Sequence, residues 1–110
     1  MRGRPPLTAA QRFARNLAAA RKALGMRQYD VIMRMRTRGH QWPQGTVSKI
    51  ERGHRDVSEA EAESLAEIVG VSVHLLRTEA RHRVAHFART PSGRVRIGTI
   101  AARRRMEAMR

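Results

Sequence analysis

Residues 44 to 53 read Gln44-Gly45-Thr46-Val47-Ser48-Lys49-Ile50-Glu51-Arg52-Gly53. Val47 and Ile50 give a short helix pattern one apolar side, and Gln44, Ser48 and Lys49 give it a polar side without an acid. Gly53 stands where a helix usually ends. A glutamine can pair with adenine, a lysine can donate to guanine, and a helix N-terminus favours a nearby phosphate. The pattern therefore predicts a helix over residues 44–52 that enters the major groove of DNA.

The composition supports a polyanionic partner. The chain has 110 residues, a formal net charge of +14 and no cysteine. This charge density favours binding to nucleic acid, and the missing cysteines exclude a disulfide framework and a zinc knuckle. Because no apolar run approaches the length of a membrane span and no signal-peptide stretch opens the chain, we expect a cytoplasmic protein that does not contact a membrane.

The acidic residues are concentrated in one stretch. Asp56, Glu59, Glu61, Glu63 and Glu67 make up five of the nine acids in the chain. The rest of the sequence is correspondingly more basic. This asymmetry suggests one face for DNA and another face that is turned away from it.

Capping signals and apolar spacing predict an all-α fold. Residues 1–7 form an arm, because two prolines and a glycine disfavour a helix there. A capping box at Thr8 begins a first helix that ends before Gly25, and a second helix runs from about residue 28 to residue 39. Beyond the 44–52 helix, a capping box at Ser58 begins a fourth helix that ends at Gly70, and Ser72 caps a short fifth helix.

Residues 78–110 form a basic extension with few apolar side chains. We expect a helix from about residue 78 to residue 89, a turn, a short strand near residues 95–97 and a last helix from Thr99. This extension could form a dimer interface, dock on the main domain, or become ordered on DNA. We favour dimerisation, since a strand edge and an apolar helix stripe both favour a partner.

Three segments in order, residues 24–28, 46–53 and 65–72, resemble the lambda-repressor and Cro type of helix-turn-helix domain, the XRE family. The resemblance covers residues 8–77. It implies a five-helix domain that binds double-stranded DNA, usually as a homodimer on a near-palindromic site. A phage or actinobacterial source would suit such a small, arginine-rich regulator.

The resemblance also implies roles for individual residues. Arg21 and Glu51 occupy positions that pair across helices one and three in some members of the family. The base-reading positions are Gln44, Gly45, Thr46, Ser48 and Lys49, and the phosphate positions are Arg27, Gln28, Arg38, Arg52, His54 and Arg55.

Three features depart from the family pattern. The turn before the third helix is about five residues longer than usual, so helix two is extended or the turn loops out. Arg27 stands where a capping Ser or Thr is common, and Gly45 leaves one reading position without a side chain. Trp42, in the lengthened turn, could stack on a nucleotide, but we favour packing against helix two.

Catalysis and cofactor binding have little support. His82 and His86 have the spacing of metal ligands on a helix, but the sequence supplies neither an HExxH pattern nor an obvious third ligand. We therefore expect no enzyme activity, no cofactor, no metal and no small-molecule ligand.

The sequence thus favours a sequence-specific DNA-binding transcriptional regulator, with a repressor preferred. An antitoxin that binds its own operator and an architectural protein with little sequence preference remain alternatives. The arm segment Arg2-Gly3-Arg4 precedes a proline and resembles the core of an AT-hook, which lies in a narrow minor groove.

Overall fold

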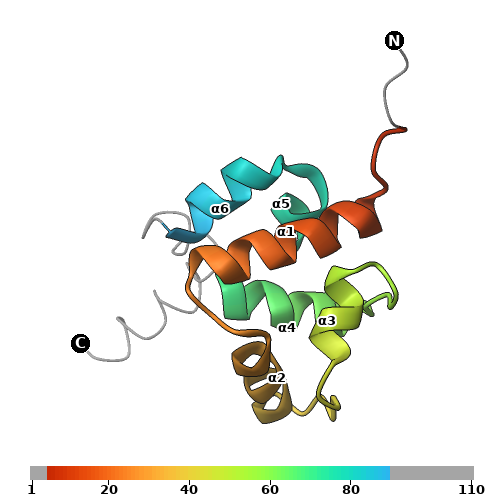
Figure 1. The fold of residues 1–110 in the computed structure, drawn as a ribbon, viewed down its shortest axis with the longest axis vertical. Helices are drawn as coiled ribbons and strands as arrows, with labels where there is room; N and C mark the ends of the chain where they lie inside the picture. Colours follow the sequence, from red (N-terminus) through yellow and green to blue (C-terminus); the bar gives the residue numbers. More distant parts are fainter. Residues whose placement is uncertain (1–4, 90–110) are drawn as a thin grey trace, which may run out of the picture.

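The structure, a computed structural model, describes residues 5–89, which form six helices and no strand (Figure 1). The helices are α1 (Ala9–Ala23), α2 (Gln28–Thr37), α3 (Thr46–Glu51), α4 (Glu59–Val69), α5 (Val73–Thr78) and α6 (Arg81–Arg89). The all-helical prediction is confirmed for this part of the chain. The predicted five-helix domain is not confirmed, because a sixth helix, which we expected in the extension, packs with the first five.

The predicted capping signals begin the helices. Thr8 Oγ1 accepts a hydrogen bond from the Gln11 backbone N–H at 3.0 Å, and the Gln11 side chain accepts one from the Thr8 N–H at 2.9 Å. Ser58 and Glu61 form the same reciprocal box at the start of α4. Gly70 ends α4 with a φ of 73°, in the left-handed region that favours glycine. These local rules fixed most helix boundaries.

Helices α3, α4, α5 and α6 pack around α1, and α2 packs on α3 and α4. In Figure 1, α3 and α4 lie on one side of α1, and α5 and α6 lie on the other. Phe13, Leu17 and Ala20 of α1 are buried between these two sides. The remaining core comes mainly from α2 and α4, through Val31, Ile32, Met35, Ala62, Leu65, Ala66 and Val69. Because every helix contributes to this one core, α3 is held on a continuous packed body.

Helix α6 belongs to this core. Val84 and Ala88 have no exposed surface and pack with the other core residues. The chain is extended at Glu79, between α5 and α6, and the carbonyl of Glu79 accepts hydrogen bonds from Arg15 and Asn16 of α1. The predicted helix from about residue 78 to residue 89 corresponds to α6, which begins at Arg81 and packs on the earlier helices across the predicted domain end at residue 77.

The other predictions for the two ends of the chain lie outside the described residues. They concern residues 1–4 of the arm, the strand near residues 95–97 and the helix from Thr99.

Candidate nucleic-acid interface

Helix α3 begins two residues later than the predicted start at Gln44. Gly45, the residue before the helix, has a φ of 98°, which an α-helix cannot include and which side-chain-bearing residues rarely adopt. Gln44 is exposed and lies in the turn that enters the helix. Gly45 thus acts as the joint that turns the chain into α3.

Thr46 does not have the exposed position that its base-reading role requires. Its side chain is buried, and Oγ1 donates a hydrogen bond to the carbonyl of Pro43 at 2.9 Å. Thr46 therefore braces the turn before α3, which corrects the sequence prediction. Ser48 is half-buried.

Exposed polar groups lie along and just after α3. Lys49 is exposed and has no hydrogen-bond or ion-pair partner among residues 5–89. Arg52 and His54 are also exposed, and the only side-chain bond of Arg52 in this part of the chain is a long one of 3.3 Å to the Ser48 carbonyl. With Gln44, these side chains give the surface around α3 several hydrogen-bond donors that are available to a ligand.

A buried ion pair ties α3 to α1. Arg21 Nε and Nη2 donate to the two carboxylate oxygens of Glu51 at 2.7 and 2.9 Å, and both side chains are about nine-tenths buried. Arg21 also donates to the Met26 carbonyl at 2.9 Å, and Gln28 Nε2 donates to Glu51 at 3.0 Å. The predicted pair is therefore present, and it extends to the start of α2.

Gln28 consequently has a different setting from a free phosphate-binding side chain. Its amide already donates to Glu51 and is only half-exposed. Because an amide has two N–H donors, Gln28 can reach a phosphate with its second donor while keeping this bond.

The lengthened turn, residues 38–45, loops out from the end of α2, and its middle is pinned to the body. Trp42 is 5% exposed, so the predicted core position of this side chain is confirmed. Its Nε1 donates to Glu61 of α4 at 2.9 Å, and its carbonyl accepts from Arg36 of α2 at 2.9 Å. His40 Nε2 lies 2.9 Å from Ser64 Oγ of α4. Helix α2 ends at Thr37, so the extra residues lengthen the turn and not the helix.

Arg55 takes part in the same cluster. Its guanidinium lies over the Trp42 ring, 5.1 Å from the centroid, and donates two hydrogen bonds to the Glu61 carboxylate. The bonds from Arg55 lower the pKa of Glu61 to about 2, assisted by the Ser58 N–H and Trp42 and opposed by burial. Arg55 therefore secures the turn, which competes with the predicted phosphate contact.

Two other predicted phosphate residues also have carboxylate partners. Arg27 pairs with Asp30, whose carboxylate accepts the Arg27 backbone N–H at 2.7 Å, while no side chain at Arg27 accepts from the first turn of α2. The Arg27 guanidinium lowers the pKa of the Asp30 carboxyl. Arg38 lies at the opposite end of α2 and pairs with Glu67 of α4 at 2.7 Å. Of the predicted DNA-contacting side chains, Gln28, Gln44, Lys49, Arg52 and His54 are at least partly exposed and hold no ion pair among residues 5–89.

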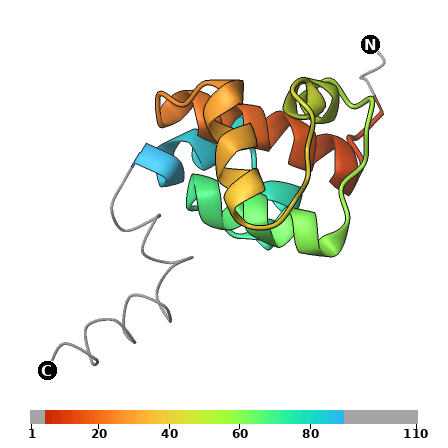
Figure 2. The ribbon, with the colours of Figure 1, turned by 90° about the horizontal axis from the view of Figure 1, so that it is seen from below.

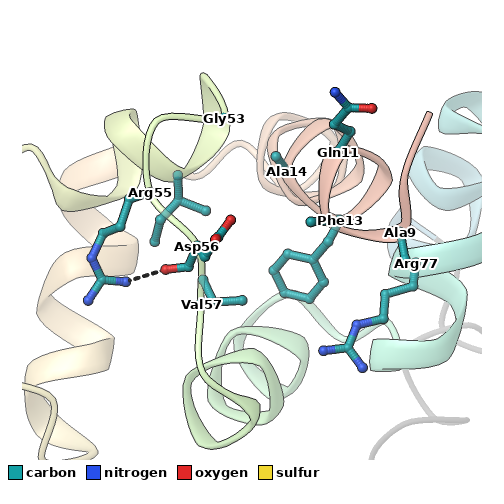
Figure 3. A pocket seen from close by; sticks show the side chains of 11 residues that line it. Ala9, Gln11, Phe13, Ala14, Gly53, Arg55, Asp56, Val57 and Arg77 are labelled. Carbon is teal, nitrogen blue, oxygen red and sulfur yellow. Dashed lines mark hydrogen bonds between the residues drawn. The ribbon is translucent and has the colours of Figure 1, made fainter. Parts of the chain in front are cut away.

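A cavity of about 510 Å³ lies beside the end of α3 (Figure 3). Phe13, Val57 and the first residues of α1 line it, and Arg55 and Arg77 enter from two sides. Both cations are already neutralised, Arg55 by Glu61 and Arg77 by Glu59 at 2.6 Å. Asp56, which also lines the cavity, forms no ion pair among the described residues, so the cavity offers a ligand no unpaired cation.

Sequence reasoning missed two residues that hold the interface together. In the sequence, Glu61 stands out only as one of the clustered acids, and nothing marks Arg36. The contacts that define both roles involve Trp42, which is 19 residues from Glu61. The one signal in the sequence was the single tryptophan, Trp42, in an unusually long turn, which indicates that the turn is packed against the rest of the domain.

Within residues 5–89, no helix is long and apolar enough to cross a membrane, and no group of three His, Asp or Glu side chains is placed to hold a metal ion.

Comparison with known proteins assigns the fold. No curated protein and no solved structure is significantly similar to the chain. A family model described as a helix-turn-helix domain matches residues 12–89, which include the whole of α6. The chain therefore belongs to the helix-turn-helix family of DNA-binding domains.

Proposed function

We propose that the protein is a transcriptional regulator that reads a specific double-stranded DNA site, with α3 in the major groove. The observation that carries the proposal is the contrast within α3. One side is locked into the core by Val47, Ile50 and Glu51, while Lys49 projects without a partner among the described residues. A rigid helix with a free cation is suited to direct readout, because its reading groups lose little freedom on binding.

Within this proposal, Gln44 and Lys49 read base edges, while Ser48 lies near the groove floor. Gly45 allows a close approach of backbone to DNA because it carries no side chain. Gln28, Arg52 and His54 contact phosphates, which fixes the register of α3 on the duplex. We further propose that the protein acts as a homodimer and represses transcription.

The arm residues Arg2 and Arg4 add a minor-groove contact in this proposal. Deleting residues 2–6 should weaken binding most on A/T-rich flanks and should lower the salt slope by up to about two units. An unchanged flank preference and salt slope would make the arm a passive terminus.

Site selection from a random duplex pool tests the main proposal. The full chain should enrich one motif and prefer it over random DNA by roughly a thousandfold or more at physiological salt. A pool that stays random after repeated rounds would instead support the architectural alternative, which the excess basic charge favours.

A further inference from the structure

A second surface carries positive charge without carboxylate partners. A groove of about 850 Å³ lies between the first half of α1 and the start of α6, and it is bordered by Pro5, Pro6 and Leu7. Arg12, Arg15, Arg81 and His82 line this groove, and no acidic side chain does. The groove therefore differs from the cavity beside α3, where each arginine is neutralised.

Arg15 is held in place as a cation. Its Nη2 donates to the Glu79 carbonyl at 3.0 Å and its Nε to Asn16 Oδ1 at 3.2 Å. Asn16 is itself fully buried and bonded to the carbonyls of Leu76 and Glu79. The two acceptors of Arg15, the Glu79 carbonyl and Asn16 Oδ1, are neutral. The half-buried guanidinium of Arg15 is therefore held in position without being neutralised.

Arg12 and Arg81 complete the positive surface. Neither side chain has a hydrogen-bond or ion-pair partner among residues 5–89. The nearest acid in this region, Glu79, is engaged by Arg83 at 3.2 Å. The first turn of α6 contains no acidic residue, so its backbone N–H groups add to the positive potential.

This surface faces away from α3. Helices α3 and α6 lie on opposite sides of α1 in Figure 1, and the view from below in Figure 2 also separates them. We therefore expect a straight duplex bound at α3 to leave the groove free. Arginines spaced along a surface, of which Arg15 is held in place, suit the phosphodiester backbone.

We propose that the groove formed by Arg12, Arg15, Arg81 and His82 binds the phosphate backbone of a second DNA duplex, so that one molecule bridges two duplexes. The proposal rests on the proposed function only in taking DNA as the partner. The second contact is independent of sequence and depends on salt.

A bridging assay with the full chain tests this proposal. A duplex that carries the selected site is fixed to beads and loaded with protein, and a fluorescent duplex of random sequence is then added. The test variant is Arg12→Gln with Arg81→Gln. The matched control is Lys22→Gln with Arg34→Gln, which removes two exposed cations whose side chains form no hydrogen bond or ion pair in the described part of the chain, although Arg34 acts on Asp30 at longer range.

Wild type and the control should retain the second duplex, and the test variant should retain it about tenfold less, as expected from two lost phosphate contacts. Binding to the first duplex, measured by anisotropy, should be almost unchanged. The melting temperature should be unchanged too, because neither Arg12 nor Arg81 has a structural partner. The single variant Arg81→Gln should give a smaller loss of the same kind.

Three outcomes would overturn the proposal. If wild type, the test variant and the control retained the second duplex equally, the groove would not be the bridging surface. Any bridging would then come from the two α3 surfaces of a dimer. An equal loss on the first duplex would place the groove on the same DNA as α3. Equal losses of retention in the test variant and the control would show that bridging depends on the net charge of the protein and not on the groove. Failure of the proposed function would give a different result. The protein would then bind a first duplex of any sequence equally well, and retention of the second duplex would still depend on Arg12 and Arg81.

Discussion

The arginines that hold α3 and the lengthened turn differ in their partners from those that line the groove between α1 and α6. On the side of α3 and α4, Arg21, Arg38 and Arg55 each bind a carboxylate, and those contacts hold α3 and the lengthened turn in place. On the side of α6, Arg12 and Arg81 bind nothing in the described structure. A net charge of +14 favours binding to a polyanion, but the ion pairs decide which cations are left to bind it.

The acidic stretch explains part of this difference. Glu59, Glu61 and Glu67 each pair with an arginine from elsewhere in the fold. The acids of this stretch, which we predicted to lie on a face turned away from DNA, thus also neutralise specific arginines. Lys49 and Arg52 form no ion pair with these carboxylates, so their charges remain available to bind DNA.

Removing α6 should give the largest effect. A chain cut after Leu76 loses the buried side chains Val84 and Ala88 and exposes part of α1. We expect the free energy of unfolding to fall by about 5 kcal/mol or more, from lost apolar burial and the space left in the core. Thermal melting followed by circular dichroism measures this loss, with a chain cut after Arg89 as the control. A chain cut after Leu76 that melts like the control would make α6 an appendage, as the sequence suggested.

Breaking the buried pair should give the next largest effect. Glu51→Ala leaves Arg21 charged and buried, and we expect a cost of about 3–5 kcal/mol in the free energy of unfolding. DNA binding should weaken in parallel, because α3 loses its tie to α1. The control is Glu63→Ala, which removes an exposed acid without a partner in the described residues. Equal melting temperatures for the two variants would contradict a stabilising role for the pair.

The cluster around Trp42 should make stability depend on pH. Glu61 has a folded-state pKa of about 2, below its ordinary value of 4.5. A lowered pKa stabilises the fold above about pH 4.5, and this contribution is lost as the pH falls toward 2. Glu61→Gln should therefore cost about 2 kcal/mol at pH 7 after allowance for solvent screening, and much less near pH 2.

Urea unfolding at a series of pH values, followed through the single tryptophan, measures this difference. Glu67→Gln is the control, because its pair with Arg38 is exposed. A constant cost of Glu61→Gln across the pH range would show that the carboxylate charge does not hold the turn.

The sequence predicted the elements that follow local rules. Thr8, Ser58 and Gly70 mark helix ends within a few residues of their partners, so capping and spacing suffice there. The anchors of the turn could not be predicted in this way. Trp42 meets Glu61 across 19 residues, and Asn16 meets the Leu76 carbonyl across 60, so these contacts exist only after the helices have packed.

The same limit applied to the site. Thr46 and Lys49 look equivalent in a reading-helix pattern, and both were assigned to bases. The positive φ of Gly45 delays the start of the helix and places Thr46 against Pro43. Which side chains remain free depends on this backbone conformation, which the sequence alone did not specify.

The two lysines of the chain provide the most direct test of the central claim that α3 reads DNA bases. Lys49 and Lys22 are both exposed and neither has a partner among residues 5–89, but only Lys49 lies on α3. The measurement is the affinity of Lys49→Ala and Lys22→Ala for the selected site and for random duplex, at one salt concentration. We predict that Lys49→Ala costs about 1–3 kcal/mol on the selected site and much less on random DNA, while Lys22→Ala changes neither preference. Equal losses for Lys49→Ala on both duplexes would contradict base reading by α3.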